Sequence, residues 1–253
     1  MRILVTNDDG ILAPGIAALA RSLRSLGDVE VVAPESVQSG AAHAITFNAP
    51  LMCERVAVDG EFFGWSVDGS PADCVKLGVH ELCAERPDLV VSGINAGANR
   101  GVDVIYSGTV AGAVEAAFIG IPSIAISLEA AGGFDFPRAG AIACDIVARA
   151  LKIGVDSGTV LNVNIPRLDG EEPRGVKVVR QSTAPWTDSY DRRADPRGRP
   201  YFWLTDEGER GASEPADTDL AALRAGFVTI TPLQHDLTEY KQLDRLDRAW
   251  RED

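Results

Sequence analysis

The feature of this 253-residue sequence that most restricts its fold is an alternation that runs to about residue 165. Short apolar runs alternate there with segments in which apolar residues recur at helical spacing. Strand–helix–strand units of this kind build a parallel sheet with helices on its faces. The apolar runs are continuous, as expected for strands buried on both sides. The sequence therefore predicts an α/β fold, with strands at 3–6, 29–33, 88–94, 123–127 and 160–165 and helices at 14–26, 70–83, 108–121 and 139–151.

The last third of the chain has a different pattern. Apolar runs at 176–181, 201–205 and 227–231 are predicted strands, loops rich in Pro, Gly, Arg and Asp separate them, and a helix is predicted at 241–251. We expect a single domain with a βαβ-type body over about 1–165 and a β-rich C-terminal part over about 166–253. The stretch 192–215 clusters Tyr201, Phe202 and Trp203 among polar turns. Such a hairpin is marginal alone and predicts a partner surface in a homodimer, although it could instead fold back on its own body.

Charge and hydropathy limit the partners of the chain. It contains 37 acidic and 24 basic residues, which gives a formal net charge of −13. A surface this negative repels the phosphate backbone, so binding to a nucleic-acid duplex is not expected. No membrane partner is expected either, because the longest apolar candidate, 116–128, contains Pro122 and is shorter than the roughly 20 residues of a membrane span.

The N-terminus and the cysteines favour a cytoplasmic protein. The first apolar run is too short for a signal peptide, because Asp8 and Asp9 follow it at once. Without a secretory signal, cysteines outside C-x-x-C pairs are expected to stay reduced. The four cysteines, none of them in such a pair, are Cys53, Cys74, Cys83 and Cys144.

Several common catalytic motifs are absent from the sequence. It contains no G-x-x-x-x-G-K-[ST], which argues against a P-loop NTPase, and no H-E-x-x-H zinc motif. It also lacks the G-x-S-x-G turn of serine hydrolases. The chemistry therefore has to come from another set of residues.

Small polar and acidic residues follow three of the predicted strands. The first loop carries Asp8 and Asp9, the second carries Ser39, and the third carries Asn95 and Asn99. In open α/β sheets, ligands bind outside the carboxyl ends of the strands. Carboxylate, hydroxyl and amide oxygens are hard ligands that suit Mg²⁺, Mn²⁺ or Ca²⁺. The competing interpretation is that the aspartates cap a helix or are solvated, and that Ser39 and Asn95 make ordinary turn hydrogen bonds.

The segment Ser107-Gly108-Thr109 opens a predicted helix. Free N–H groups at a helix start, flanked by two hydroxyls and a glycine, suit a phosphate group. An ordinary serine N-cap explains the same residues equally well. A phosphate site beside oxygen ligands for a metal would favour metal-assisted phosphoryl hydrolysis.

Together these motifs resemble the SurE family of stationary-phase survival proteins, over nearly the whole chain. The matching segments are MRILVTNDDG at 1–10, APGI at 13–16, SGA at 39–41, DGSPADCV at 68–75, VSGIN at 91–95, Asn99, YSGTV at 106–110, DPRGRPY at 195–201 and ITPLQ at 230–234. The resemblance implies a three-layer α/β/α, Rossmann-like body and a C-terminal extension that is exchanged between the subunits of a homodimer, with tetramers in some members.

The resemblance also implies an activity and a set of site residues. The activity is that of a metal-dependent 5′- and 3′-nucleotidase acting on nucleoside monophosphates, with polyphosphate as a further substrate of some members. One divalent cation per subunit, Mg²⁺, Mn²⁺ or Ca²⁺, is expected. The implied metal ligands are Asp8, Asp9, Ser39 and Asn95, the implied catalytic residues are Asp8, Asp9 and Asn95, and the implied phosphate-binding residues are Asn99, Ser107, Gly108 and Thr109.

Some positions depart from the family pattern. The loop at 34–38 lacks the arginines that are frequent there, Leu12 stands where histidine is frequent, and Ala42 stands where serine is frequent. None of these is an implied metal ligand, so we expect the chemistry to survive. His43 is either a general acid or a packed loop residue.

Two other functions remain open at the level of sequence. A haloacid-dehalogenase-like phosphatase would form an aspartyl-phosphate, but it uses D-x-D, whereas Asp8 and Asp9 are adjacent. A non-catalytic nucleotide-binding protein would carry a degenerate site, which the intact Asp8, Asp9, Ser39 and Asn95 argue against.

Overall fold

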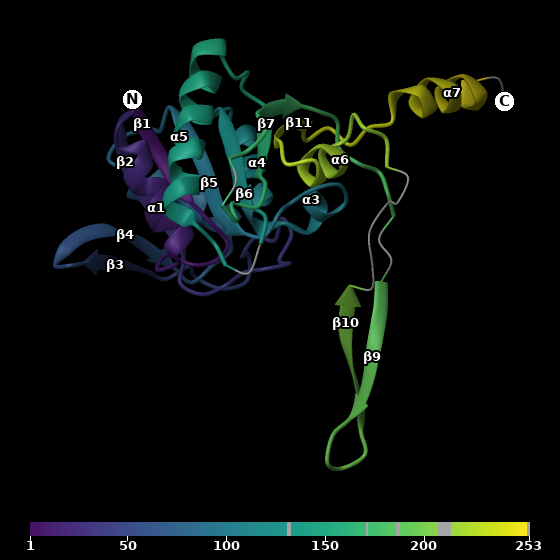
Figure 1. Cartoon of the computed structure of the whole chain (residues 1–253), viewed down its shortest axis with the longest axis horizontal. Helices are drawn as coiled ribbons and strands as arrows, with labels where there is room; N and C mark the ends of the chain where they lie inside the picture. The colour runs from purple at the N-terminus through teal and green to yellow at the C-terminus, as the bar shows by residue number, and fades with distance from the viewer. Residues whose placement is uncertain (131–132, 171, 186–187, 207–213, 252–253) are drawn as a thin grey trace.

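A nine-stranded sheet forms the centre of the computed structural model, which describes residues 1–130, 133–170, 172–185, 188–206 and 214–251 (Figure 1). The strand order is β3-β4-β2-β1-β5-β6-β7-β11-β8. The strands from β4 to β7 are parallel to one another, whereas β3 runs antiparallel to β4 and β11 antiparallel to β7. The strands of this sheet are β1 (Arg2–Thr6), β2 (Asp28–Pro34), β3 (Cys53–Val58), β4 (Glu61–Val67), β5 (Leu89–Ala96), β6 (Ser123–Leu128), β7 (Thr159–Ile165), β8 (Val176–Val178) and β11 (Val228–Gln234).

Helices cover both faces of the sheet (Figure 1). Helices α1 (Pro14–Leu23) and α5 (Phe136–Ile153) pack together on one face, and α2 (Pro71–Leu77) and α4 (Gly108–Phe118) pack together on the other. Buried apolar side chains of α1 and α5, such as Ile16, Leu19 and Val147, form one core with the sheet. A second core includes Val75 of α2 and Ala116 of α4. This arrangement confirms the predicted three-layer α/β/α fold.

The helix predicted at 70–83 begins as expected but changes its geometry partway. Ser70 and Asp73 form a reciprocal capping box, in which each side chain accepts a hydrogen bond from the other residue's backbone N–H. The α-helix ends at Leu77, and a π-helical turn over Gly78–Leu82 follows it. Three further helices are α3 (Asp103–Tyr106), α6 (Asp219–Arg224) and α7 (Tyr240–Arg251).

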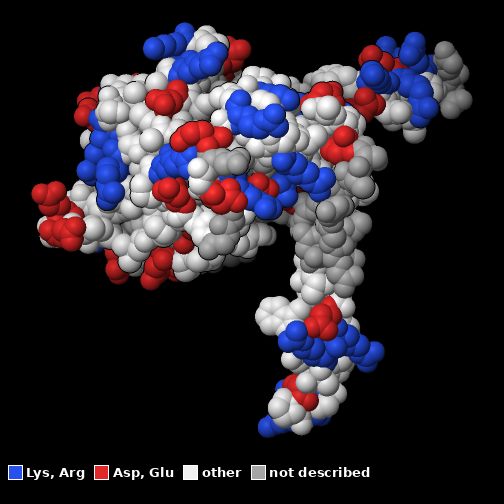
Figure 2. All heavy atoms as spheres, in the orientation of Figure 1, with Lys and Arg blue, Asp and Glu red and all other residues white. Residues whose placement is uncertain are grey.

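A separate two-stranded hairpin, β9 (Asp188–Ala194) and β10 (Pro200–Asp206), stands away from the body (Figure 1). Strand β10 covers the predicted strand at 201–205, and residues 207–213 of the predicted stretch 192–215 lie outside the described residues. Tyr190, Phe202 and Trp203 are exposed on the hairpin. Charged side chains of both signs also lie on the hairpin, as Figure 2 shows.

The sequence analysis missed β3, β4 and β9. Most residues of β3 are exposed, so the strand has no buried apolar run to mark it. The predicted strand at 176–181 is shorter than expected and ends at Val178. Among the described residues, no helix is long and apolar enough to cross a lipid bilayer.

Candidate functional site

The candidate site lies at the carboxyl edge of three neighbouring parallel strands. Strand β1 lies between β2 and β5, and all three run in the same direction. The loops that leave β1 and β2 and the end of β5 therefore meet at one edge, where open α/β sheets bind ligands. Asp8 and Asp9 follow β1, Ser39 follows β2, and Asn95 lies near the end of β5.

Asp8 is the buried centre of this edge, with 4% of its surface exposed. Its carboxylate oxygen Oδ1 accepts a short hydrogen bond from the hydroxyl of Thr109, which is fully buried. Its backbone carbonyl accepts a hydrogen bond of 2.8 Å from the N–H of Gln38, the residue before Ser39. Asp8 thus connects the end of β1 with α4 and with the loop that carries Ser39.

Asp9 faces the end of β5. Its Oδ2 accepts a hydrogen bond of 3.0 Å from the N–H of Ala96, the residue after Asn95. The Asn95 side chain donates from Nδ2 to the carbonyl of Gly97 at 2.7 Å, a bond that uses the nitrogen and not the oxygen of that amide. The pairing of β5 with β6 shifts register between Ser92 and Asn95, and such an irregularity re-aims the side chains beyond it.

The two adjacent carboxylates have perturbed titration. Burial raises the pKa of Asp8, the hydrogen bond from Thr109 opposes the shift, and the neighbouring charge of Asp9 adds to it. Burial also raises the pKa of Asp9, against the hydrogen bond from Ala96. Neither shift includes a contribution from a cationic side chain of the described residues. The charged forms of both carboxylates are therefore unfavourable, and a bound cation would stabilise them.

Helix α4 begins directly against Asp8. A Cβ added to Gly108 would lie 2.8 Å from the Cβ of Asp8 and 3.0 Å from its Oδ2, so only glycine permits this approach. Ser107 is the N-cap, and its Oγ accepts a hydrogen bond of 3.1 Å from the N–H of Val110. The serine cap that the sequence left open as an alternative is therefore present. It leaves the first N–H groups of α4 next to Asp8.

Asn99 is held from two strands farther along the same edge. Its backbone N–H donates to Oδ1 of Asn164 at 2.8 Å, and its carbonyl accepts from the amides of Asn164 and Asn162. Its Nδ2 donates to Oγ of Ser127 at 2.8 Å. The sequence analysis missed Asn162 and Asn164, although two asparagines at alternate positions of a buried strand are a signal that they serve a polar purpose.

Comparison with known proteins identifies the family. The family model of the survival protein SurE matches residues 3–188. The 5′-nucleotidase SurE of Syntrophobacter fumaroxidans is 48% identical over 248 residues, which cover 98% of this chain and 99% of that protein. The 5′-nucleotidase SurE of Moorella thermoacetica is 49% identical, over 97% of this chain and 95% of its own length. The chain belongs to the SurE family. The crystal structure of the SurE protein from Aquifex aeolicus matches it with a TM-score of 0.87 and 43% identity, over all of both chains.

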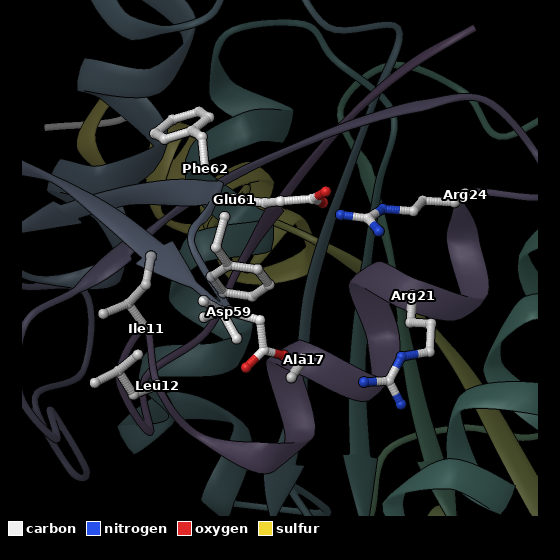
Figure 3. Close-up of a pocket in the computed structure, with 10 residues that line it drawn as sticks. Ile11, Leu12, Ala17, Arg21, Arg24, Asp59, Glu61 and Phe62 are labelled. Atoms are coloured by element: carbon white, nitrogen blue, oxygen red, sulfur yellow. The ribbon is translucent and has the colours of Figure 1, made fainter.

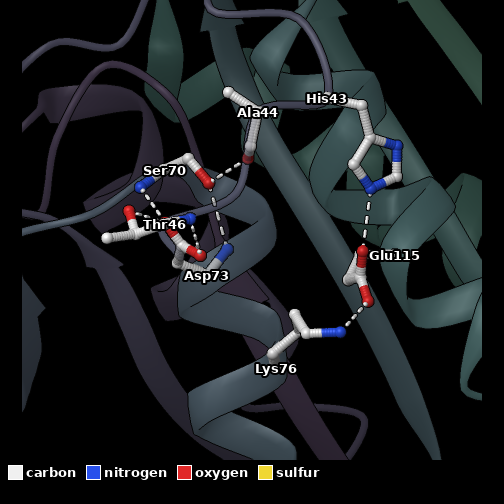
Figure 4. A network of polar contacts seen from close by, with 7 residues as sticks. All are labelled: His43, Ala44, Thr46, Ser70, Asp73, Lys76 and Glu115. Carbon is white, nitrogen blue, oxygen red and sulfur yellow. Dashed lines mark hydrogen bonds and ion pairs between the residues drawn. The ribbon is translucent and has the colours of Figure 1, made fainter. Parts of the chain in front are cut away.

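A polar network beside the SurE-family site was not predicted (Figure 4). Glu115 of α4 lies buried between His43 and Lys76, with Oε2 2.8 Å from Nε2 of His43 and Oε1 accepting from Nζ of Lys76 at 3.0 Å. The His43 ring stacks on Phe118, with centroids 5.2 Å apart. Of the two roles left open by the sequence, these contacts favour the packed loop residue.

Two residues that depart from the family pattern, Leu12 and Ala42, differ in their surroundings. Leu12 is 73% exposed, and Ala42 has a φ of 52°, in the left-handed region that non-glycine residues seldom adopt. Leu12 borders a cavity of about 370 Å³ between α1 and the β3–β4 hairpin (Figure 3). Arg21 and Arg24 line this cavity opposite Asp59 and Glu61, and none of the predicted site residues lines it.

The residues at the sheet edge fit a hard divalent cation. Two carboxylates, a hydroxyl and an amide supply oxygen donors only. Within the described part of the chain, no group of three or more His, Cys, Asp and Glu side chains is placed to hold a metal. The raised pKa values of Asp8 and Asp9 are the electrostatic observation that agrees with a cation between them.

Proposed function

We propose that this chain is a metal-dependent phosphomonoesterase that hydrolyses nucleoside 5′-monophosphates to nucleoside and phosphate. The observation that carries the proposal is the contact between two elements: the carboxylate pair Asp8–Asp9 and the glycine-opened start of α4 at Gly108. The carboxylate pair can hold a cation, and the start of α4 can hold an anion beside it. The relatives named 5′-nucleotidase SurE support the nucleotide as substrate. Nucleoside 3′-monophosphates and short polyphosphate are proposed as further substrates.

The metal ligands in this proposal are Asp8, Asp9, Ser39 and Asn95. When bound, one Mg²⁺, Mn²⁺ or Ca²⁺ ion per subunit supplies Lewis-acid polarisation of the phosphoryl group. Asp8, Asp9 and Asn95 are the proposed catalytic residues, because they would hold the ion that polarises the phosphoryl group. Asp8 is fixed through Thr109 and Asp9 through Ala96, so neither carboxylate needs to reorient when substrate arrives.

The phosphate-binding residues in the proposal are Asn99, Ser107, Gly108 and Thr109. The N–H groups at the start of α4 stabilise an anion by roughly 0.3–1 kcal/mol through the helix dipole, and by up to about 2 kcal/mol in a partly buried site. Ser107 caps the N-terminus of α4, and Gly108 leaves room for a phosphate oxygen. Thr109 has one hydroxyl proton, so it can donate to Asp8 or to the phosphate but not to both at once.

The setting of the enzyme is also a proposal. The chain acts in the cytoplasm, as a homodimer with exchanged C-terminal segments that can pair into a tetramer. It has no nucleic-acid duplex or membrane as partner. The aromatic side chains exposed on the hairpin support the dimer, and the net charge of −13 supports the absence of a nucleic-acid duplex as partner.

The test is hydrolysis of a panel of phosphate esters by the purified protein. AMP, 3′-AMP and short polyphosphate are assayed by phosphate release under Mg²⁺, Mn²⁺ and Ca²⁺, with and without EDTA. Hydrolysis of AMP that EDTA abolishes and a divalent cation restores is the expected result. Asp9→Asn should remove most of this activity, whereas the matched change Asp59→Asn, in the exposed β3–β4 turn, should not.

Three results would count against the proposal. Undiminished turnover in EDTA would refute the metal, and nucleotide binding without turnover would favour a nucleotide-binding protein. Trapping of phosphate on an aspartate would instead indicate the haloacid-dehalogenase mechanism.

A further inference from the structure

Within the described part of the chain, the Ser39 hydroxyl makes no hydrogen bond that would fix its position. Ser39 is exposed, and it lies in the loop that leaves β2; residues 35–46 are called the Ser39 loop below. On one side, the N–H of Gln38 donates to the carbonyl of Asp8 at 2.8 Å. On the other side, the N–H of Ala42 donates to the carbonyl of Tyr106 at 3.2 Å, and His43 contacts Glu115. The position of the Ser39 hydroxyl therefore depends on its neighbours in the loop.

The contact between His43 and Glu115 joins the two halves of the proposed site. The Ser39 loop carries the hydroxyl ligand, and α4 carries Gly108 and Thr109 near its start and Glu115 farther along. Figure 4 shows the His43 ring reaching from the loop to the Glu115 carboxylate, with Lys76 of α2 on its other oxygen. The stacking of His43 on Phe118, with an interplanar angle of 14°, fixes the plane of the imidazole.

Burying the charged Glu115 carboxylate costs free energy, and both of its oxygens have a hydrogen-bond partner. Only 6% of its side chain is exposed, and each carboxylate oxygen has a partner. Burial opposes the charged form, but the hydrogen bonds from His43 and Lys76 prevail and lower the pKa of Glu115. A charged buried acceptor of this kind holds its donors more firmly than a neutral one. It can therefore act as a fixed point for a loop.

We propose that Glu115 is a positioning residue that holds the Ser39 loop against α4 through His43, and that this contact sets the affinity of the site for its cation. The inference rests on the proposed function, because it takes Ser39 as a ligand. Partners that orient metal ligands typically account for 10–100-fold in metal affinity. A second anchor farther along the loop, where Asp73 accepts from the N–H and hydroxyl of Thr46, holds the loop on α2 and does not depend on Glu115.

Three variants separate this role from general stability. His43→Phe keeps an aromatic ring to stack on Phe118 and removes the hydrogen bond to Glu115. Glu115→Gln keeps the shape of the acceptor and removes its charge. Lys76→Met is the matched control, because it removes the other ion pair of Glu115 without touching the Ser39 loop.

The readout is the dissociation constant for Mn²⁺ without substrate, measured from the electron paramagnetic resonance of free Mn²⁺. Hydrogen exchange of residues 35–46 is measured on the same samples. We expect His43→Phe and Glu115→Gln to weaken Mn²⁺ binding by about tenfold and to speed exchange in the loop, and Lys76→Met to change neither. His43→Gln, whose amide can donate to Glu115, should recover most of the affinity.

The possible outcomes are distinct. Unchanged Mn²⁺ affinity in both His43→Phe and Glu115→Gln overturns the inference and leaves the proposed function standing. Equal weakening by Lys76→Met also overturns it, because the effect would then follow from lost stability. A wild-type protein that binds no Mn²⁺ overturns the inference together with the proposed metal site.

Discussion

At the scale of single residues, the site is shaped by the cost of burying two adjacent carboxylates. Asp8 is almost fully buried, Asp9 is half-buried beside it, and the pKa of each is raised chiefly by burial. A protein that folds with such a pair gives up stability in its metal-free form. That loss is explained if the pair meets a cation during function.

The first prediction concerns Asp8→Asn. The amide oxygen can still accept from Thr109, so the geometry survives, but the buried charge is gone. We expect the metal-free variant to gain about 1 kcal/mol in free energy of unfolding, and to lose about 100-fold or more in AMP hydrolysis. Urea unfolding in EDTA and phosphate release under saturating Mn²⁺ measure the two quantities. Wild-type turnover in Asp8→Asn would remove this carboxylate from the mechanism.

The second prediction concerns Thr109→Val. The Thr109 hydroxyl donates to Asp8, a proposed metal ligand. Removing a donor to a charged acceptor typically costs about 1.5–3 kcal/mol. We expect Thr109→Val to raise the Mn²⁺ dissociation constant as well as the inhibition constant of inorganic phosphate. If only the inhibition constant of phosphate changed, the hydrogen bond from Thr109 to Asp8 would not contribute to metal affinity.

The third prediction is a pH dependence at Glu115. The folded protein lowers the pKa of Glu115 from its ordinary value of 4.5, so the charged form stabilises the fold above that pH. This stabilisation is lost as the pH falls through the lowered pKa. Glu115→Gln should therefore be less stable than wild type by about 1–3 kcal/mol near neutral pH, and the gap should close as the pH falls below 4.5 through the lowered pKa of Glu115. Urea midpoints over that range test it, and a gap that is independent of pH would refute it.

At the scale of elements, α4 is the one that the site depends on most. Its packing fixes where its first turn points, and Gly108 sets how close that turn comes to Asp8. In Gly108→Ala, the new methyl group would need the Asp8 side chain to move, since their separation would be 2.8 Å. We expect Gly108→Ala to lower kcat/KM for AMP more than Thr109→Val does. Gly133→Ala, at a glycine with no heavy atom near its Cβ position and a φ outside the left-handed region, is the matched control. Equal activity in Gly108→Ala and wild type would place the phosphate elsewhere.

Elements that bury apolar residues could be predicted from the sequence, and elements without a buried face could not. The strand β5 and the helix α4 were evident because nearly all their residues are buried. Strand β9 reads Asp-Ser-Tyr-Asp-Arg-Arg-Ala and pairs only with β10, so its sequence has no core pattern. The contact of His43 with Glu115 joins residues 72 positions apart, and no local spacing indicates it. The carboxylate pair could be predicted, because burying two charged aspartates directly after a strand costs free energy unless they bind a partner.

At the scale of the whole molecule, the C-terminal third both completes the sheet and extends away from it. Strand β11 pairs with β7, and the buried Asp219 accepts hydrogen bonds from the N–H groups of Gly101 and Ser182. By contrast, the β9–β10 hairpin and α7 stand clear of the body (Figure 1), and α7 buries none of its residues. An amphipathic helix and an apolar hairpin without cover indicate a partner surface.

The last prediction is that this partner is a second copy of the chain. Neighbouring residues on a strand face opposite sides, so Phe202 and Trp203, 57% and 60% exposed, make both faces of β10 apolar. Fully covering such a side chain is worth about 1.5–3 kcal/mol, and a dimer contains two copies of each, so a Phe202→Ser/Trp203→Ser double variant should weaken dimerisation by at least about 10²-fold. Light scattering at micromolar concentration should give twice the 26.9 kDa chain mass for wild type and a mass near that of one chain for the double variant. Phe47→Ser, at an 83% exposed phenylalanine outside the hairpin, should remain dimeric. A monomeric wild-type protein, or a double variant that stays dimeric, would show that the hairpin is not the contact.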